Sequence, residues 1–284
     1  MTVFEQERRR FHAQLLESIL TIDSKGVASN ADSNNKLSID LAKHVADQLG
    51  RTTVQLRGAG QTSGNKFEAH CRDFLDRTFT SLAHLRPGHW QIDQITGRNR
   101  LEIARYDQYA HLVALSRAAK KDPELAAALG NDYTITPDVV ISREPEPDET
   151  VNAHLPLVDA MVARRSSLRS INNPQPILHA SISCKWTIRS DRAQNSRTEG
   201  LNLIKNRKGR LPHVVVVTGE PLPSRISAIA LGTGEIDCVY HFALKELEAA
   251  VKDLHLADSV ELLNIMVQGN RLRDIADLPL DLAV

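Results

Sequence analysis

Short apolar runs alternate with segments of helical periodicity over the second half of the chain, and this alternation limits the fold more than any other feature of the sequence. Four runs rich in β-branched residues predict strands: TPDVVISR, ILHASISCKWTI, HVVVVT and RISAIALGTG. Two segments with apolar positions at helical spacing predict helices: RAQNSRTEGLNLIKNRKGR and KELEAAVKDL. Strands that alternate with helices indicate an α/β fold, so we expect a central mixed β-sheet flanked by helices.

The N-terminal part of the chain has a different pattern, because its apolar positions recur mostly at helical spacing. Four segments predict helical structure: residues 4–20, residues 39–49, GAGQTSGNKFEAHCRDFLDRTF and residues 101–129. In the third segment a glycine-punctuated loop leads into the helix, and Ser63 or Asn65 is the expected N-cap. The fourth segment predicts a helical pair that breaks near Asp122.

Length and composition fit a folded protein with a sizeable core. The chain has 284 residues, of which 42% are hydrophobic and 25% charged, and these values exclude wholesale disorder. We expect a single domain over residues 1–284, in which helical elements (1–130) precede an α/β core (131–284). The Pro- and Glu-rich run REPEPDET predicts a mobile surface loop within that core.

Several classes of protein are disfavoured by composition. Three cysteines lie far apart without a CxxC pair, which argues against zinc and against a disulfide framework and suits a reducing cytoplasm. The charged N-terminus is not a signal peptide, and the longest aliphatic run, Val214 to Val217, is too short for a membrane span. Aromatic residues make up only 4%, which argues against recognition of single strands by base stacking. We therefore expect a cytoplasmic protein without membrane partners.

Four polar residues occur in an order that metal-dependent phosphodiester cleavage requires. Asp138 opens the first predicted strand, Ser183 and Lys185 lie within the second, and Glu199 lies on the following helix. Carboxylates hold hard cations through their oxygens, and a nearby lysine can orient water or neutralise developing charge. Each residue alone is common at such places, so the prediction of a Mg²⁺ site rests on their joint order and their strand–strand–helix placement.

This pattern resembles the PD-(D/E)XK nuclease superfamily, with one displacement. The superfamily usually has an acid two residues before the lysine, where this chain has Ser183. Glu199, 14 residues after Lys185, could supply the missing carboxylate from a helix packed behind the strand. The rearranged order P-D, S-x-K, E resembles that of restriction enzymes that recognise CCGG-containing sites, and it implies a restriction-endonuclease-like core.

A strongly basic segment follows the lysine, although Lys plus Arg and Asp plus Glu both number 35 in the whole chain. From Lys185 to Arg210 there are eight basic and two acidic side chains, a local balance of +6. Such a segment suits a phosphate-binding face, although many basic helices are merely solvated. Arg189, Asp191 and Arg192 stand where the strand gives way to the helix. Arginine pairs with guanine and aspartate accepts from cytosine, so a symmetric dimer could read a G/C palindrome; alternatively, Asp191 only caps the helix.

Longer segments resemble the family of NgoMIV-type restriction endonucleases. They are spread over essentially the whole chain and include HASISCKWTIRSDRAQN, NRKGRLPH, ALGTGEIDCVYHFAL and DLPLDLAV. The resemblance implies a Mg²⁺-dependent type II restriction endonuclease that cuts double-stranded DNA at GCCGGC and leaves 5′-phosphate ends. It also implies a homotetramer formed by two dimers. The loop 29–40 and the connector 143–168 differ most from the family's pattern.

The same resemblance assigns individual roles. It gives catalytic roles to Asp138, Ser183, Lys185, Glu199 and Glu68. It makes Asp138, Glu68, Glu199 and the main-chain carbonyl of Cys184 metal ligands. It implies that Arg189, Asp191 and Arg192 read the inner CCGG, that Arg225 and Asp32 read the outer G·C pair, and that Gln61 approaches from the minor groove.

Two other functions remain compatible with parts of the sequence. A repair or junction nuclease of the same fold would recognise DNA structure and would lack a base-reading cluster such as Arg189 to Arg192. A non-catalytic DNA-binding regulator would be expected to have lost Asp138 or Lys185, and both are present. A methyltransferase would need a glycine-rich cofactor turn after an early strand, and no clear strand precedes GAGQTSG.

Overall fold

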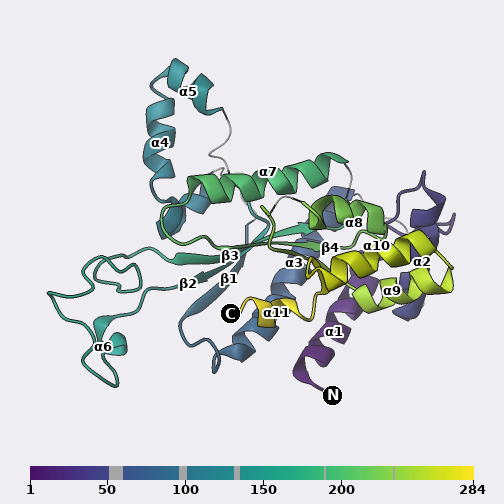
Figure 1. Ribbon diagram of the computed structural model, residues 1–284, viewed down its shortest axis with the longest axis horizontal. Helices are drawn as coiled ribbons and strands as arrows, with labels where there is room; N and C mark the ends of the chain where they lie inside the picture. Colours follow the sequence, from purple (N-terminus) through teal and green to yellow (C-terminus); the bar gives the residue numbers. More distant parts are fainter. Residues whose placement is uncertain (51–59, 96–100, 131–134, 189, 233) are drawn as a thin grey trace.

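A mixed sheet, with six strands among the residues that the structure describes, lies at the centre of the protein (Figure 1). The computed structural model describes residues 1–50, 60–95, 101–130, 135–188, 190–232 and 234–284. The strands lie in the sheet in their sequence order: β1 (Trp90–Gln94), β2 (Val139–Arg143), β3 (Ile177–Lys185), β4 (His213–Thr218), β5 (Cys238–His241) and β6 (Leu272–Asp274). Strands β1 to β3 pair antiparallel and β3 to β6 pair parallel, which confirms the predicted α/β fold with a mixed sheet.

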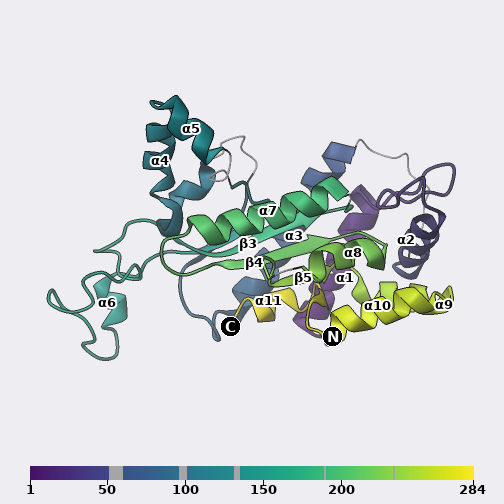
Figure 2. The same cartoon turned by 45° about the horizontal axis from the view of Figure 1, so that its top comes forward.

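Helices cover both faces of this sheet (Figure 2). The helices of the described residues are α1 (Val3–Ser18), α2 (Lys36–Gln48), α3 (Gly60–Phe79), α4 (Leu112–Ala119), α5 (Pro123–Leu129), α6 (Asp148–Val151), α7 (Ser190–Asn206), α8 (Pro223–Ala230), α9 (Leu244–Asp253), α10 (Ala257–Gln268) and α11 (Leu278–Asp281). The side chains of Ser183 and Cys184, neighbours in β3, contact α7 and α3 respectively. Because successive strand residues face opposite ways, α7 and α3 lie on opposite faces of the sheet.

Most predicted elements are confirmed, and the errors have simple causes. Residues 225–230 of the run RISAIALGTG, which was expected as a strand, lie in helix α8, because Ile226, Ile229 and Ala230 bury one helical face after a proline in the first turn. Helix α3 begins at Gly60, so Ser63 and Asn65 lie inside it and are not its N-cap. Strands β1, β5 and β6 were not predicted. They have three to five residues each, too few to show a clear alternation.

The break in the predicted helical pair is confirmed at Asp122. Its carboxylate accepts hydrogen bonds from the main-chain N–H groups of Glu124 and Leu125, and Pro123 begins α5. Helices α4 and α5 project away from the sheet in Figure 1. Two short 3₁₀ helices, Glu102–Arg105 and Asp107–Tyr109, precede α4, and a third, Thr80–Leu82, follows α3. None of the helices built from described residues has both the length and the apolar character that crossing a bilayer demands.

A buried ion cluster joins the first helix to the C-terminal part of the chain. The guanidinium of Arg8 on α1 bonds both carboxylate oxygens of Glu246 on α9, at 2.8 and 2.6 Å, and both of Asp274 in β6, at 2.8 and 2.7 Å. Burial alone would raise the pKa of the Asp274 carboxyl, but its bonds to Arg8 lower it below the usual value. The two carboxylates therefore depend on Arg8 for compensation of their charge.

We expect Arg8→Ala to lower the free energy of unfolding by about 3–5 kcal/mol, because it leaves two carboxylates buried without a counterion. Arg9→Ala is the matched control, since Arg9 is exposed and forms an ion pair with Glu5 one turn away on the helix surface. That change should alter the free energy of unfolding by no more than about 0.5 kcal/mol. Urea unfolding followed by circular dichroism measures both, and equal effects of the two substitutions would contradict the assignment.

Candidate functional site

The pairing of β2 with β3 brings the predicted catalytic residues together. Val139, the first residue of β2, lies opposite Ile182 in the antiparallel ladder. Asp138 immediately precedes Val139, so its side chain lies beside the C-terminal end of β3, which contains Ser183 and Lys185. The sequence predicted that these residues converge, and the register explains how.

Asp138 is held from two directions by β3. One carboxylate oxygen, Oδ2, accepts a hydrogen bond from the main-chain N–H of Cys184 and another from Nζ of Lys185, each at 2.7 Å. Burial alone would lower the pKa of Lys185, but the negative charges of Asp138 and Glu199 outweigh burial and raise it. Lys185 is therefore a fixed ammonium ion at the site and not a general base.

Two further carboxyl groups face the same pair. Burial, followed by the charge of Asp138, raises the pKa of Glu68 on α3 to about 7, although Gln94 donates to it at 3.1 Å and Lys185 acts in the opposite direction. Burial and then Asp138 likewise raise the pKa of Glu199 on α7 to about 8, with Lys185 again opposing. The negative charge of Asp138 thus disfavours ionisation of both glutamates, and the positive charge of Lys185 compensates for it only in part.

The place of the displaced acid is explained by the packing of α7 on β3. The hydroxyl oxygens of Ser183 and Ser196 lie 3.4 Å apart, and both side chains are buried. Glu199 lies three residues after Ser196, so the two side chains share one face of α7. Glu199 therefore lies on the face of the sheet toward which Ser183 points. An acidic side chain at position 183 of β3 would point to that same face.

Two contacts on either side of Glu199 fix the position of α7. Arg197 forms an ion pair with Glu235, which is almost fully buried. At Gly200, an added Cβ atom would lie 2.7 Å from the main-chain oxygen of Glu235, so only glycine allows this close approach. These contacts hold the helix at a set distance from the sheet, and with it the carboxylate of Glu199.

The thiol of Cys184 takes no part in this cluster. It is buried and lies against Cys71 of α3, on the face of β3 opposite Ser183. Burial, with Cys71 next, raises the pKa of the Cys184 thiol well above its usual value, so the side chain stays neutral. Only main-chain atoms of Cys184 can therefore serve the site.

The residues expected to read the outer base pair also come together. Arg225 of α8 forms an ion pair with Asp32, although 193 positions separate them in the sequence. Both side chains are partly exposed, at 29% and 27%. Side by side, an arginine can donate to guanine and a carboxylate can accept from the cytosine amino group of one G·C pair.

Other predicted DNA-binding residues lie at the edge of what the structure describes. Arg189 is outside the described residues. Asp191 and Arg192 fall in the first turn of α7, and Gln61 falls in the first turn of α3, but their side chains are outside the described part of the chain. The beginning of a helix is the part that can approach base edges in the major groove.

The sequence analysis missed a group of residues that support the site. At the end of β4, Thr218 and the following Gly219 donate hydrogen bonds to the carbonyl of Lys185, at 2.8 and 3.0 Å. Glu220, which follows them, is fully buried. The sequence offered one sign of their importance, since the predicted strand HVVVVT ends in Thr218 and is directly followed by Gly219 and Glu220. In open α/β sheets, ligands bind beyond the carboxyl ends of parallel strands.

Trp186 fixes the chain between the lysine and the helix. Its ring packs against Phe67 and Phe242, with centroid distances of 5.1 and 5.6 Å, and its indole N–H donates to the Ser29 hydroxyl at 3.3 Å. At Gly219 an added Cβ atom would lie 2.5 Å from this ring, so a glycine is required there. Lys185 therefore lies in a rigid stretch of chain.

The arrangement offers hard oxygen donors beside a fixed positive charge. Among the residues that the structure describes, no three His, Cys, Asp or Glu side chains are already placed to hold a metal ion together. The donor set nevertheless fits a hard divalent cation, because its members are carboxylates and because such a cation would relieve the repulsion that raises the pKa values of Glu68 and Glu199. Cation, carboxylates and lysine together suit the cleavage of a phosphodiester bond.

Comparison with known proteins agrees with this chemistry. The family model for the NgoMIV restriction enzyme matches residues 11–284. A relative described as the type II restriction enzyme NgoMIV of Neisseria gonorrhoeae is 61% identical over 283 residues, which cover 99% of each chain. The chain belongs to the NgoMIV restriction enzyme family. It is accordingly a type II restriction endonuclease, a site-specific deoxyribonuclease, as the resemblance predicted.

Solved structures similar to this member of the NgoMIV family are also restriction endonucleases. They include PspGI in a complex with substrate DNA (13% identity, TM-score 0.29, covering 99% of this chain and 90% of that one). They also include Bse634I with cognate DNA (12%, 0.35, covering 96% and 92%) and a BsaWI–DNA complex (12%, 0.32, covering 95% and 97%).

The raised pKa of Glu199 predicts a pH-dependent cost to stability. A glutamate in the unfolded chain titrates near about pH 4.3, whereas the pKa of Glu199 in the folded chain is about 8. Between these values the folded protein binds more protons than the unfolded chain, so without metal its stability falls as pH rises. Glu199→Gln removes this effect and should raise the melting temperature in EDTA at about pH 9, with little change at about pH 4.

Glu124→Gln is the control, because Glu124 is an exposed residue of α5. Its melting temperature should follow that of the wild type at every pH. Parallel curves for the wild type and Glu199→Gln would show that Glu199 is not a buried, charge-repelled carboxylate.

Proposed function

We propose that this endonuclease hydrolyses double-stranded DNA at the palindrome GCCGGC in a Mg²⁺-dependent reaction that leaves 5′-phosphate ends. The observation that carries this proposal is the fixed pair of Asp138 and Lys185, joined at 2.7 Å and flanked by the carboxyl groups of Glu68 and Glu199. Hydrolysis forms a bond from a water oxygen to phosphorus and breaks the bond to the 3′ oxygen, so the phosphate remains on the 5′ end.

We assign the metal ligands to Asp138, Glu68, Glu199 and the main-chain carbonyl of Cys184. When bound there, a divalent cation would polarise the scissile phosphate and lower the pKa of a bound water. The two glutamates must lose their protons to bind the cation. Their pKa values of about 7 and 8 therefore predict that Mg²⁺ binds more tightly as pH rises through this range.

The protein's own groups have distinct tasks in the reaction. Lys185 keeps its positive charge and lies beside Asp138, where it can orient the attacking water or neutralise charge on the phosphate. The contact between Ser183 and Ser196 packs α7 against β3, and Glu199, three residues after Ser196, is then the acid that α7 adds to the site. The hydrogen bonds from Thr218 and Gly219 keep the carbonyl of Lys185, and so its main chain, in place.

Base recognition is assigned to two groups of residues. We propose that Arg189, Asp191 and Arg192 read the inner CCGG from the start of α7, while Arg225 and Asp32 read the outer G·C pair. The ion pair between Arg225 and Asp32 supports the second group, because it already sets a donor beside an acceptor. Gln61 is assigned to the minor groove. A palindrome read in this way requires two copies of the chain related by twofold symmetry.

We further propose a homotetramer, a dimer of dimers, on the basis of the loop formed by residues 144–176. This loop, which contains α6, extends away from the sheet (Figure 1). It exposes large apolar side chains: Leu155, Leu157, Met161, Val162 and Ile171, at 49–76% exposure. Several large apolar side chains exposed on one projecting loop are typical of a surface that another protein covers.

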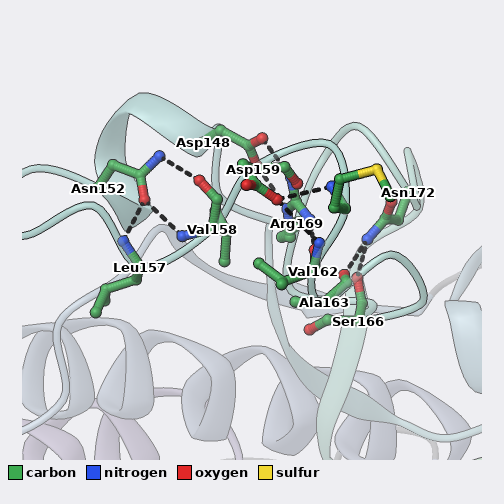
Figure 3. Close-up of polar contacts among 11 residues, drawn as sticks. Asp148, Asn152, Leu157, Val158, Asp159, Val162, Ala163, Ser166, Arg169 and Asn172 are labelled. Atoms are coloured by element: carbon green, nitrogen blue, oxygen red, sulfur yellow. Dashed lines mark hydrogen bonds and ion pairs between the residues drawn. The ribbon is translucent and has the colours of Figure 1, made fainter.

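The 144–176 loop is also held together by hydrogen bonds within itself. Figure 3 shows Arg169 among the oxygens of Asp148, Asp159 and Val162. Its guanidinium bonds both carboxylate oxygens of Asp148, at 2.8 and 2.6 Å, and the carbonyls of Asp159 and Val162, at 2.9 and 2.6 Å. A preorganised loop loses little conformational entropy on association, which favours a stable interface.

We propose that residues 1–284 work as one endonuclease domain in the cytoplasm. One hydrophobic core runs through both halves of the chain, from Phe11 in α1 to Leu282 near the C-terminal end of the sequence. Strand β1 comes from the part of the chain expected to be helical and pairs with β2, next to Asp138. The N-terminal part therefore helps to build the catalytic sheet.

Asp138→Ala and Lys185→Ala should each reduce cleavage by roughly 100-fold or more, because each removes charge stabilisation at the reacting phosphate. Specific binding of GCCGGC duplexes should persist, since neither residue belongs to the base-reading groups. The measurement is cleavage of plasmid DNA with Mg²⁺ and with EDTA, followed by sequencing of the ends, beside a gel-shift titration.

Lys121→Ala is the control, because Lys121 is an exposed lysine after α4 and should leave cleavage unchanged. Wild-type turnover by either site variant would refute the catalytic assignment. Wild-type ends at any other sequence would refute the proposed recognition site.

Replacing Leu155, Met161 and Ile171 together by serine should convert the tetramer to a dimer, because it removes the apolar surface of the 144–176 loop. Light scattering measures the mass. Two-site and one-site plasmids compared at limiting enzyme measure the function, and the wild type should prefer the two-site plasmid while the variant shows no preference. Val113→Ser, an exposed apolar position on α4, is the control. A dimeric wild type with equal rates on both plasmids would contradict the tetramer.

A further inference from the structure

Glu220 is a buried carboxylate at the point where three parts of the site meet. It follows Gly219, after the end of β4, and its side chain has no exposed surface. Oxygen Oε2 accepts the main-chain N–H of Ile188 at 2.7 Å, and oxygen Oε1 accepts that of Leu222 at 3.2 Å. One side chain thus holds two main-chain segments that lie 34 positions apart in the sequence.

Those two segments lead directly to the assigned base-reading residues. Ile188 is the residue before Arg189, with which the inner reading group begins. Leu222 is the residue before α8, and Arg225 lies within the first turn of that helix. The guanidinium of Arg225 also approaches the Oε1 atom of Glu220, at 3.9 Å, while it pairs with Asp32. Glu220 therefore contacts the main chain directly before the inner reading group, at Ile188, and directly before α8, at Leu222.

The catalytic strand is tied to the same short run of chain. Thr218 and Gly219, the residues before Glu220, bond the carbonyl of Lys185, and the side-chain amide of Asn30 donates to the carbonyl of Gly219 at 2.7 Å. Asn30 stands two residues before Asp32. Residues 218–220 consequently contact Lys185 in β3, Ile188 just before the inner reading group, Leu222 just before α8, and Asn30 in the loop that contains Asp32.

A buried carboxylate at this position lowers the stability of the folded protein. Burial raises the pKa of Glu220 to about 7, against the opposing effects of its two N–H donors and Arg225. A neutral side chain would avoid the desolvation of a charge. Glutamate offers something that neutral side chains of this size do not, namely two equivalent acceptor oxygens that can hold two N–H groups at once.

We propose that Glu220 is a positioning residue for sequence recognition, which sets the inner and outer reading groups in register with each other and with the catalytic strand. This inference rests on the proposed function, because it assumes that these groups read base pairs. If it holds, loss of Glu220 weakens discrimination at the inner and outer base pairs together. Loss of Arg225 weakens discrimination at the outer pair alone.

The test uses Glu220→Gln, which keeps the size of the side chain but has a single acceptor oxygen. Cleavage efficiency, kcat/KM, is measured on the GCCGGC duplex and on two duplexes with one substituted pair, outer or inner. For Glu220→Gln the ratio of cognate to substituted efficiency should fall about tenfold for both duplexes. Arg225→Ala, as the reference, should lower only the outer ratio. Unchanged ratios in Glu220→Gln would overturn the proposal.

Glu246→Gln is the matched control, because Glu246 is another mostly buried glutamate with both oxygens bonded, but in the Arg8 cluster away from the site. It should lower stability without changing either ratio. Glu220→Asp is the second variant, in case Glu220→Gln fails to fold. It keeps the charge but is one methylene too short to hold both amides, so it should lower both ratios as well, and unchanged ratios would again overturn the proposal.

Amide hydrogen exchange separates failure of this inference from failure of the proposed function. In Glu220→Gln the amides of Ile188 and Leu222 should exchange faster than in the wild type, while those of the Arg8 cluster stay unchanged. A wild type that does not prefer GCCGGC refutes the proposed function but leaves this readout valid. Unchanged exchange at both amides would show that Glu220 does not position these segments.

Discussion

The antiparallel register between β2 and β3 is the constraint on which the rest of the site depends. Val139 lies opposite Ile182, and this places Asp138 where the Cys184 amide and the Lys185 ammonium can both reach it. A shift of one residue would turn every side chain of a strand to the other face of the sheet. Lys185 would then point toward α3, away from Glu199 on α7.

The electrostatics of the fold separate the carboxylates of the Arg8 cluster from those of the candidate site. In the Arg8 cluster, Asp274 and Glu246 have an arginine between them, and despite burial the pKa of each is lowered. Around Asp138 the balance is reversed, because a single lysine faces three carboxyl groups and the pKa values of Glu68 and Glu199 are raised. Ionisation of these carboxyl groups thus lowers the free energy of unfolding, and binding of a hard cation would offset that loss.

The parallel pairing of β3 with β4 adds a second requirement, since Lys185 lies opposite Thr218. The end of β4 therefore stands beside the lysine, and the following residues support the chain that leads into α7. The close contact between Gly219 and Trp186 leaves no room for a side chain there. The chain belongs to the NgoMIV restriction enzyme family, and we propose that cleavage and base reading share this junction.

The sequence by itself determined the α/β class, strands β2, β3 and β4, helix α7 and the order Asp138, Ser183, Lys185, Glu199, because periodicity and local residue order carry that information. It misassigned α8 and missed β1, β5 and β6, since strands of three to five residues take their conformation from neighbouring strands. It could not show that Asp32 meets Arg225 or that Glu220 joins Ile188 to Leu222. Only the tertiary structure decided these contacts, because they form between segments that the sheet brings together from distant parts of the chain.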